Sequence, residues 1–348
     1  MINIYYNNIT SSRRVRRGAD APLKHQRGIA LITAILVVAL ASIAAAAILG
    51  ATSIAIHRSS LLQDSEKAWW YGDGVETWVK AILQRDAAQN QTDSLKDDWA
   101  HPVDYLPTDE GAIKGYVEDL QGRFNLNNFG VADTKRYEQN VAYFERLLQN
   151  IDGADASQAR PIAAAIRDWI DADDRPSGTD GAEDSEYLSH NPSYRAANRP
   201  MRSVSEVLAI KGMTADLYDK LMHCEESKAG AKSCITALPQ YPTAINLNTA
   251  PLPVLRALSK KPGSGVDNFA RDRANQPMED SAGAFKAAPD GFLTAADDLP
   301  GDFVTVKSSY FLLHAEIVVG SGRLALYSFY LRPSQGAPVV LGRSIDTE

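Results

Sequence analysis

The sequence predicts an α+β fold in which one long N-terminal helix precedes a body with strands at both ends and helices in its middle. Three patterns lead to this prediction. An apolar run starts at Gly28, and no charged residue follows Arg27 until Arg58. A helical period of about 3.6 residues continues beyond that run. The period changes to the two-residue alternation of strands near Ile113 and again after Tyr310.

The apolar run, residues 29–56, is long enough to cross the roughly 30 Å core of a bilayer as a helix. Six basic residues and one acid precede it in residues 1–28. The positive-inside rule therefore keeps the N-terminus in the cytoplasm and sends the chain beyond about His57 across the membrane. The small residues Ala45–Ala47 also resemble the cleavage site of an ordinary secretory signal. One alternative is therefore a tethered periplasmic scaffold whose apolar segment is cleaved at these alanines or is never processed.

The exported body is acidic. The whole chain has a net charge of −7, and residues 1–28 contribute +5, so the body carries about −12. An acidic body argues against nucleic acid as a partner and tolerates cations such as calcium. The sequence contains no nucleophile elbow, no H-E-x-x-H zinc motif and no glycine-rich phosphate loop. We therefore expect no enzymatic activity.

The helix that begins in the apolar run is expected to end near Arg85, with Trp69, Trp70 and Trp78 packed into the core of the following domain. Residues 86–112 have the composition of a loop. The remaining elements are expected as strands at 113–119 and near 124, helices within 134–174, two short helices at 203–223 around Gly212, a helix within 248–258, a long connection at 260–300, and strands at 310–319, 323–332 and 339–343.

An acidic stretch at residues 168–186 is the strongest candidate for a binding site. It holds eight carboxylates in nineteen residues, together with Pro and Gly residues that let the backbone curl. Carboxylate and carbonyl oxygens are the ligands that calcium prefers. The stretch is not an EF-hand, because Asp171 at position 1 would place Pro176 where that loop needs glycine. The alternative is a solvated acidic loop without a cation.

Cys224 and Cys234 bracket a short polar segment. In an exported protein such a pair predicts a disulfide, and the alternative is two free thiols packed near a helix end.

Two further segments, I-K-G-M-T at 210–214 and I-N-L-N-T-A at 245–250, resemble pieces of helix-hairpin-helix and SAM-like modules. They leave open a membrane-tethered DNA receptor of the competence type, although the hairpin lacks its usual second glycine.

Several segments together resemble the type II secretion system protein K family, whose members are minor pseudopilins. The segments are R-G-I-A-L-I-T-A-I-L-V-V-A-L from Arg27, G-R-F-N-L-N-N at 122–128, the acidic stretch, S-V-S-E-V-L-A-I-K-G-M from Ser203 and I-N-L-N-T-A-P-L-P-V-L from Ile245. The resemblance implies a pilin-like core, one long helix on a small antiparallel sheet, with a large inserted helical (SAM-like) domain. It divides the chain into a prepilin leader (1–28), a transmembrane helix half (29–56), a periplasmic helix half with a loop (57–100), first strands (101–130), the insertion (131–300) and C-terminal strands (301–348).

The resemblance also implies processing, location and partners. Prepilin peptidase would cut after Gly28 and methylate the new N-terminus, Ile29. Thr33 then occupies the fifth mature position, where pilins generally carry glutamate. The protein would lie in the bacterial inner membrane with a periplasmic body. It would cap the tip of the pseudopilus and help to start its assembly, in contact with other minor pseudopilins, the major pseudopilin and membrane lipid.

In this family the acidic region is associated with bound calcium, so the resemblance adds to the expectation of a structural calcium site. Crowding of the carboxylates at 171, 173 and 174 also favours a cation, because they would repel one another without it. Which acids bind the ion does not follow from the sequence, and we choose as candidate ligands Asp171, Asp173, Asp174, Glu183 and Asp184.

Overall fold

The computed structural model describes residues 27–346, except 228–229, 286–291, 295–296 and 298. The predicted leader therefore lies almost wholly outside the described residues. The chain divides into two units, Met1–Ser60 and Leu61–Glu348. Helix α1, Arg27–Gln89, belongs to both of them.

In the first unit, α1 is apolar on all sides, and its side chains are exposed. The helix is long and apolar enough to cross a membrane. Its few polar side chains bond within the helix: the hydroxyls of Ser42 and Thr52 each donate to the carbonyl four residues earlier, at 2.8 Å. Such internal bonds satisfy polar groups in a segment that lipid surrounds.

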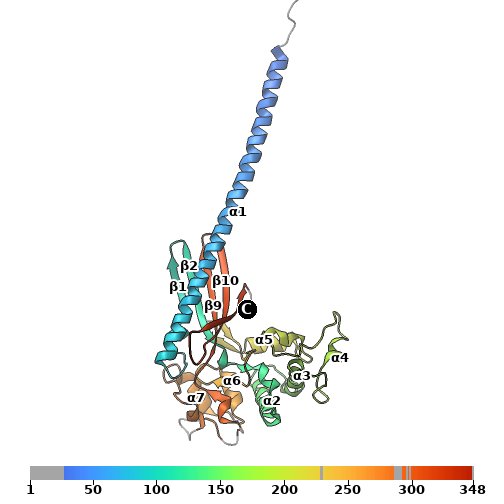
Figure 1. Ribbon diagram of the computed structural model, residues 1–348, viewed down its shortest axis with the longest axis vertical. Helices are drawn as coiled ribbons and strands as arrows, with labels where there is room; N and C mark the ends of the chain where they lie inside the picture. The colour runs from blue at the N-terminus through green and yellow to red at the C-terminus, as the bar shows by residue number, and fades with distance from the viewer. Residues whose placement is uncertain (1–26, 228–229, 286–291, 295–296, 298, 347–348) are drawn as a thin grey trace, which may run out of the picture. The chain divides into compact units, whose positions relative to one another are not determined.

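The second unit contains a five-stranded antiparallel sheet with the strand order β1-β2-β9-β10-β11 (Figure 1). The strands are β1 Val103–Thr108, β2 Gly111–Asp119, β9 Tyr310–Val319, β10 Gly322–Leu331 and β11 Val339–Ile345. One face of the sheet packs on α1 beyond Leu61, because alternate residues of each strand are apolar. Gly72 permits this close packing, since a Cβ there would lie 3.2 Å from a methyl group of Leu326.

A helical insertion lies between β2 and β9 and extends beyond one end of the sheet (Figure 1). Its helices are α2 Thr134–Gln149, α3 Ala159–Ile170, α4 Asp184–Tyr187, α5 Ala215–Met222, α6 Leu252–Leu258 and α7 Ser264–Asp272. Its core starts at Phe124 and still includes Phe303 and Val304. The insertion therefore starts some residues before the boundary at 131 that the sequence predicts, and ends after the one at 300.

Two similar motifs, F-N-L-N-N and I-N-L-N-T, hold the insertion together in the same way. Each begins with a two-residue strand, β3 Phe124–Asn125 or β7 Ile245–Asn246, which pairs in parallel with β6 Ile235–Thr236 or β8 Val304–Thr305. The second asparagine then binds both backbone groups of a methionine. Asn127 accepts from the N–H of Met201 at 2.8 Å and donates to its carbonyl at 3.0 Å. Asn248 makes the same two bonds to Met278, with the same lengths.

The structure confirms the predicted fold class and corrects three details of it. Helix α1 ends at Gln89 rather than near Arg85. Residues 86–112 are not all loop, because β1 lies within them; β1 is an edge strand with four exposed residues and a proline, so it lacks the alternation that reveals a strand. The segment 203–209 forms a 3₁₀ helix, η5 Val204–Ala209, instead of an α-helix, and Ser203 and Glu206 form a capping box at its start.

The prediction that Trp69, Trp70 and Trp78 pack into the core is wrong. Their exposed fractions are 44%, 72% and 47%. The face of α1 that meets the sheet is built from smaller side chains, which are Ala68, Gly72, Val75, Val79, Ile82 and Leu83. A helix on a sheet buries only one stripe, and the tryptophans lie beside or opposite that stripe.

Candidate functional site: an acidic loop and a buried polar network

The acidic loop is folded around Asp168, in the last turn of α3. The side chain of Asp168 is completely buried. It accepts hydrogen bonds from the backbone N–H groups of Ser177, at 2.9 Å, and of Ala182, at 2.7 Å. Gly181 is required at the closing turn, because a Cβ there would lie 2.3 Å from a carboxylate oxygen of Asp168. Asp168 thus sets the shape of the loop, a role that the sequence analysis did not assign to it.

Three carboxylates converge inside this loop. Asp171, Asp173 and Glu183 each offer one oxygen, and these oxygens all lie within 4.8 Å of one another. Glu183 is only 2% exposed. Neither of its carboxylate oxygens has a hydrogen-bond partner among the described residues, and one oxygen of Asp171 also has none. A buried carboxylate without a donor is costly, so this arrangement needs a proton or a cation.

The electrostatics of the three carboxylates agree with that requirement. Burial, followed by the negative charges of Asp168 and Asp171, raises the pKa of Glu183 to about 7. Burial also raises the pKa of Asp171, and the charge of Asp173 adds to this shift. The donor set consists of oxygens alone, which suits a hard cation such as calcium and does not suit zinc. The residues present therefore fit a calcium ion.

The structure brings together three of the five predicted ligands. Asp174 lies outside this set, and its carboxylate accepts from the side-chain amide of Asn198 at 3.4 Å. Asp184 forms an ion pair with Arg195 and accepts from the backbone N–H of Ala196 at 3.0 Å. Both oxygens of Asp184 thus have donors, unlike those of Glu183.

Cys224 and Cys234 are bonded to each other in the structure. The segment between them is a hairpin of two short strands, β4 Glu225–Ser227 and β5 Gly230–Lys232, and not the simple loop that its composition suggests. Backbone bonds fix both ends of this hairpin: the N–H of Cys224 donates to the carbonyl of Lys232, and that of Cys234 donates to the carbonyl of Leu221.

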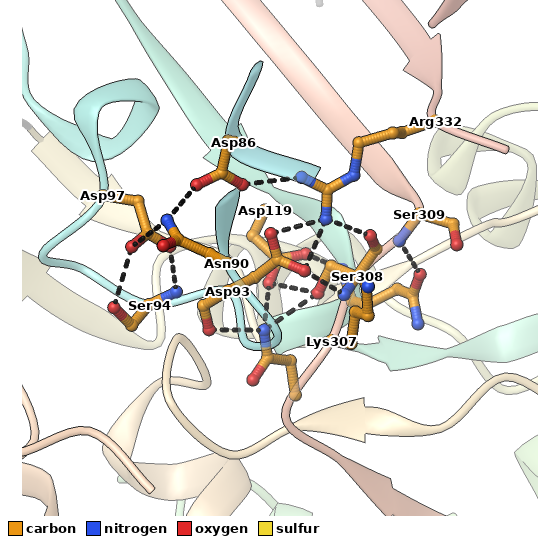
Figure 2. A network of polar contacts seen from close by, with 12 residues as sticks. Asp86, Asn90, Asp93, Ser94, Asp97, Asp119, Lys307, Ser308, Ser309 and Arg332 are labelled. Carbon is orange, nitrogen blue, oxygen red and sulfur yellow. Dashed lines mark hydrogen bonds and ion pairs between the residues drawn. The ribbon is translucent and has the colours of Figure 1, made fainter. Parts of the chain in front are cut away.

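A second group of acids surrounds Arg332, just after β10 (Figure 2). The guanidinium of Arg332 is buried and pairs with Asp86 of α1 at 2.8 Å and with Asp93 at 2.5 Å. Asp93 in turn accepts from the backbone N–H of Ser308. The carboxylates of Asp86, Asp93 and Asp97 also lie close enough to one another to hold an ion. However, each already accepts hydrogen bonds from protein donors, which are Arg332, Asn90, Ser94 and Ser308.

This network extends into the insertion through Asp119, the last residue of β2. Asp119 is buried and accepts from the hydroxyls of Ser308 and Thr249, both at 2.6 Å, and from the amide of Asn246 at 2.9 Å. Burial raises the pKa of Asp119. The I-N-L-N-T-A segment is therefore a strand and turn that lock the insertion to the sheet, and it does not form a DNA-binding hairpin. One signal of this network is visible in the sequence, a charged residue at the end of an alternating strand.

Comparisons with known proteins agree with this architecture. A family model described as type II secretion system (T2SS), protein K, matches residues 122–224. The type II secretion system protein K of Pseudomonas aeruginosa is 32% identical over 328 residues, which cover 92% of this chain and 93% of that protein. The protein of the same description from Aeromonas hydrophila is 30% identical and covers 92% of this chain and 97% of its own length.

A solved structure is also similar. It is a chain in the crystal structure of the GspK-GspI-GspJ complex from the enterotoxigenic Escherichia coli type 2 secretion system. The match has a TM-score of 0.70 and 26% identity, and it covers 84% of this chain and all of that one. The chain described here belongs to the type II secretion system protein K family and is a minor pseudopilin of type II secretion.

Proposed function

We propose that this minor pseudopilin caps the periplasmic tip of the type II secretion pseudopilus and helps to start its assembly, without an enzymatic role. Residues 29–56 of α1 anchor it in the inner membrane, with the N-terminus in the cytoplasm and the body in the periplasm. The six basic residues before the apolar run support this orientation. Prepilin peptidase cuts after Gly28 and leaves Ile29 as the methylated N-terminus.

The observation that carries the tip position is the environment of Thr33. Its hydroxyl donates to the carbonyls of Ile29 and Ala30 in its own helix, at 3.1 and 3.0 Å. A glutamate at this position would place a charge in lipid, which is costly unless the terminal ammonium of a neighbouring subunit pairs with it. A subunit with no neighbour above it lacks that partner. Thr33 avoids the cost, since its polar group needs no second subunit.

The partners follow from the similar solved chain, which was crystallised with two other pseudopilins. By analogy, this chain assembles with the corresponding two minor pseudopilins of its own system and rests on the major pseudopilin. The helical insertion supports the position at the tip, because so large a domain beyond the end of the sheet would obstruct a subunit stacked above it.

Calcium is part of the same proposal. Asp171, Asp173 and Glu183 would hold the ion, whose two positive charges would offset two of the three negative charges. The ion would close the loop that starts at the end of α3, so its role is structural. The orphaned oxygens of Glu183 support this assignment.

The test of the tip position is a Thr33→Glu variant in a strain that lacks the native protein. We expect secretion and the recovery of the three-protein complex to fall, because the added carboxylate has no ammonium partner. Thr33→Ser is the matched control, since it keeps the hydroxyl and should secrete normally. Normal secretion and an unchanged complex with Thr33→Glu would show that the carboxylate argument is wrong.

A further inference from the structure

The face of the sheet that points away from α1, which we call the outer face, is more apolar than a water-facing sheet face usually is. Leu326 of β10 packs against α1, so the next residue, Tyr327, points to the outer face. There the ring of His314 stacks on that of Tyr116, with centroids 4.3 Å apart, and the ring of Tyr327 meets it edge-on at 5.3 Å. Phe329 follows Tyr327 on the same face, and both side chains are only half-buried.

A groove remains open where the outer face meets the insertion, and we call it the outer groove. Its volume is about 470 Å³, within the roughly 300–1,000 Å³ of typical ligand sites. Tyr327 and Phe329 line it from the sheet, and Tyr218 lines it from α5 of the insertion. Gly342 of β11 lies opposite Phe329, and a Cβ there would meet nothing within 4 Å. The lack of a side chain at Gly342 therefore leaves the ring of Phe329 accessible from the edge of the sheet.

The charged side chains of the outer groove are all positive. Three arginines line it, and no carboxylate does among the described residues, although the body as a whole carries about −12. Arg123 already pairs with Glu118 at 2.7 Å. Arg343 pairs with Glu76 at 2.5 Å. The third, Arg202, is exposed, and its guanidinium has no ion-pair or hydrogen-bond partner in the described part of the chain, so the groove offers one free cation beside an apolar surface.

We propose that the outer groove binds an extended acidic segment of a partner protein, in addition to the contacts that the tip position requires. A carboxylate of that segment pairs with Arg202, since a guanidinium binds a carboxylate through two parallel hydrogen bonds. An aromatic or leucine side chain next to this carboxylate covers Phe329 beside Gly342. Strand β11 is an edge of the sheet, so its outer backbone groups are available to a segment in extended form.

An acidic peptide fits the outer groove better than a polyanion or a second copy of the chain does. A nucleic acid or another polyanion is bound through many unpaired cations, and an acidic body repels it. The groove offers one such cation among the described residues, Arg202. In a two-fold contact the same patch meets itself, which would bring the positive groove of one copy against that of the other.

The experiment selects a display library of random heptapeptides on the full-length chain in detergent. We expect the retained peptides to share Asp or Glu beside Phe, Tyr or Leu. A synthetic peptide of their consensus is then titrated against the wild type and its variants. Arg202→Ala should weaken binding of this peptide by about tenfold or more, because the carboxylate loses its charged donor.

Two matched variants accompany this one. Gly342→Val should weaken binding of the peptide similarly, because the added side chain covers Phe329. It should not lower the melting temperature, since the position is open and valine favours a strand more than glycine does. Arg271→Ala is the control, because Arg271 is an exposed arginine of α7 that does not line the groove, and this variant should bind like the wild type.

Each possible result supports or overturns the proposal. Retention of no common sequence, or of basic or uncharged sequences, overturns it, as does wild-type binding by either groove variant. If heparin binds the wild type and is lost in Arg202→Ala while no acidic peptide is retained, the groove binds polyanions instead. If the groove variants lose only self-association, measured by analytical ultracentrifugation, the groove belongs to a second copy. In each of these cases the proposal is wrong, and the tip position is unaffected.

Discussion

Glu183 carries a buried carboxylate that no protein donor contacts within the described part of the chain. Asp168, which is equally buried and only fifteen residues earlier, has backbone donors from Ser177 and Ala182. The two acids therefore have different roles. Asp168 folds the loop, and Glu183 is left available for a cation.

The stability of the protein should depend on pH and calcium through Glu183. The pKa of Glu183 is about 7 in the folded state and higher than its ordinary value of 4.5, so without calcium the folded chain binds this proton more tightly than the unfolded chain. That contribution to stability is present at low pH and is lost as pH rises from about 4.5 through about 7. Calcium binds the deprotonated form. The increase in melting temperature that calcium causes should therefore be larger near pH 8 than near pH 5.5, and an equal increase would contradict the site.

A Glu183→Gln variant tests the same residue without a change of pH. In chelator at about pH 8 it should melt at a higher temperature than the wild type, since it removes an unpaired buried charge. With calcium it should lose most of the stabilisation that the ion gives. Asp174→Asn is the matched control from the same loop, and it should retain calcium binding. Loss of binding in the control alone would place the ion elsewhere in the loop.

Crowding of acids in the sequence predicted a cluster but not its members. Asp171, Asp173 and Glu183 were among the predicted ligands. Asp184 was also chosen, but Arg195 reaches its carboxylate from a segment for which the sequence predicts no helix or strand. Which carboxylates lack donors depends on such distant partners, and the sequence does not reveal them.

At the scale of elements, the two N-L-N motifs explain how an insertion with short helices keeps its shape. Each motif pairs a two-residue strand and uses one asparagine amide to bind both backbone groups of a methionine on another segment. These side-chain bonds satisfy backbone N–H and carbonyl groups that longer paired strands would otherwise satisfy.

The equivalence of the two motifs can be measured. Asn127→Ala and Asn248→Ala should each lower the free energy of unfolding by about 2–4 kcal/mol, because each takes the side-chain partner from a methionine N–H and carbonyl, which are buried at Met201 and partly buried at Met278. Gln149→Ala, at an exposed position at the end of α2, should change it by less than about 0.5 kcal/mol. Chemical denaturation of the three variants checks this. A large loss for one asparagine and none for the other would show that the motifs are not equivalent.

Elements with a strong apolar pattern were predictable, and those without one were not. Buried residues alternate with partly buried ones along most of β10 and in β9 beyond its first four residues, and the predicted limits of both strands agree with the structure to within about one residue. Strand β1 has no such pattern because it lies at the edge of the sheet. The tryptophans of α1 were assigned to the core because apolar residues follow the helical period there, but the period does not show how narrow the buried stripe of the helix is.

At the scale of the whole second unit, the Arg332 network joins α1, the sheet and the insertion. One buried guanidinium faces Asp86 and Asp93, and Ser308 links Asp93 to Asp119 and so to Asn246. Removal of the cation would leave two buried carboxylates unpaired, and the three parts would then lose a common anchor.

Arg332→Met should therefore lower the free energy of unfolding by about 3–5 kcal/mol, the usual cost of breaking a buried ion pair from one side. Lys114→Met is the matched control. Lys114 pairs with Glu316 at 2.6 Å on the surface, and its loss should cost at most about 1 kcal/mol. Chemical denaturation of the two variants measures the free energy of unfolding that each has lost. Equal losses would mean that the network does not stabilise the fold.

The measurement that tests the tip position most directly is the location of this protein on an assembled pseudopilus. Pseudopili would be produced with a tagged copy of the chain, labelled with gold and imaged by electron microscopy. Our account predicts label at one end of each fibre and none along the shaft, because Thr33 lacks the carboxylate that would pair with the terminal ammonium of a subunit above. Label distributed along the shaft would contradict the assignment to the tip.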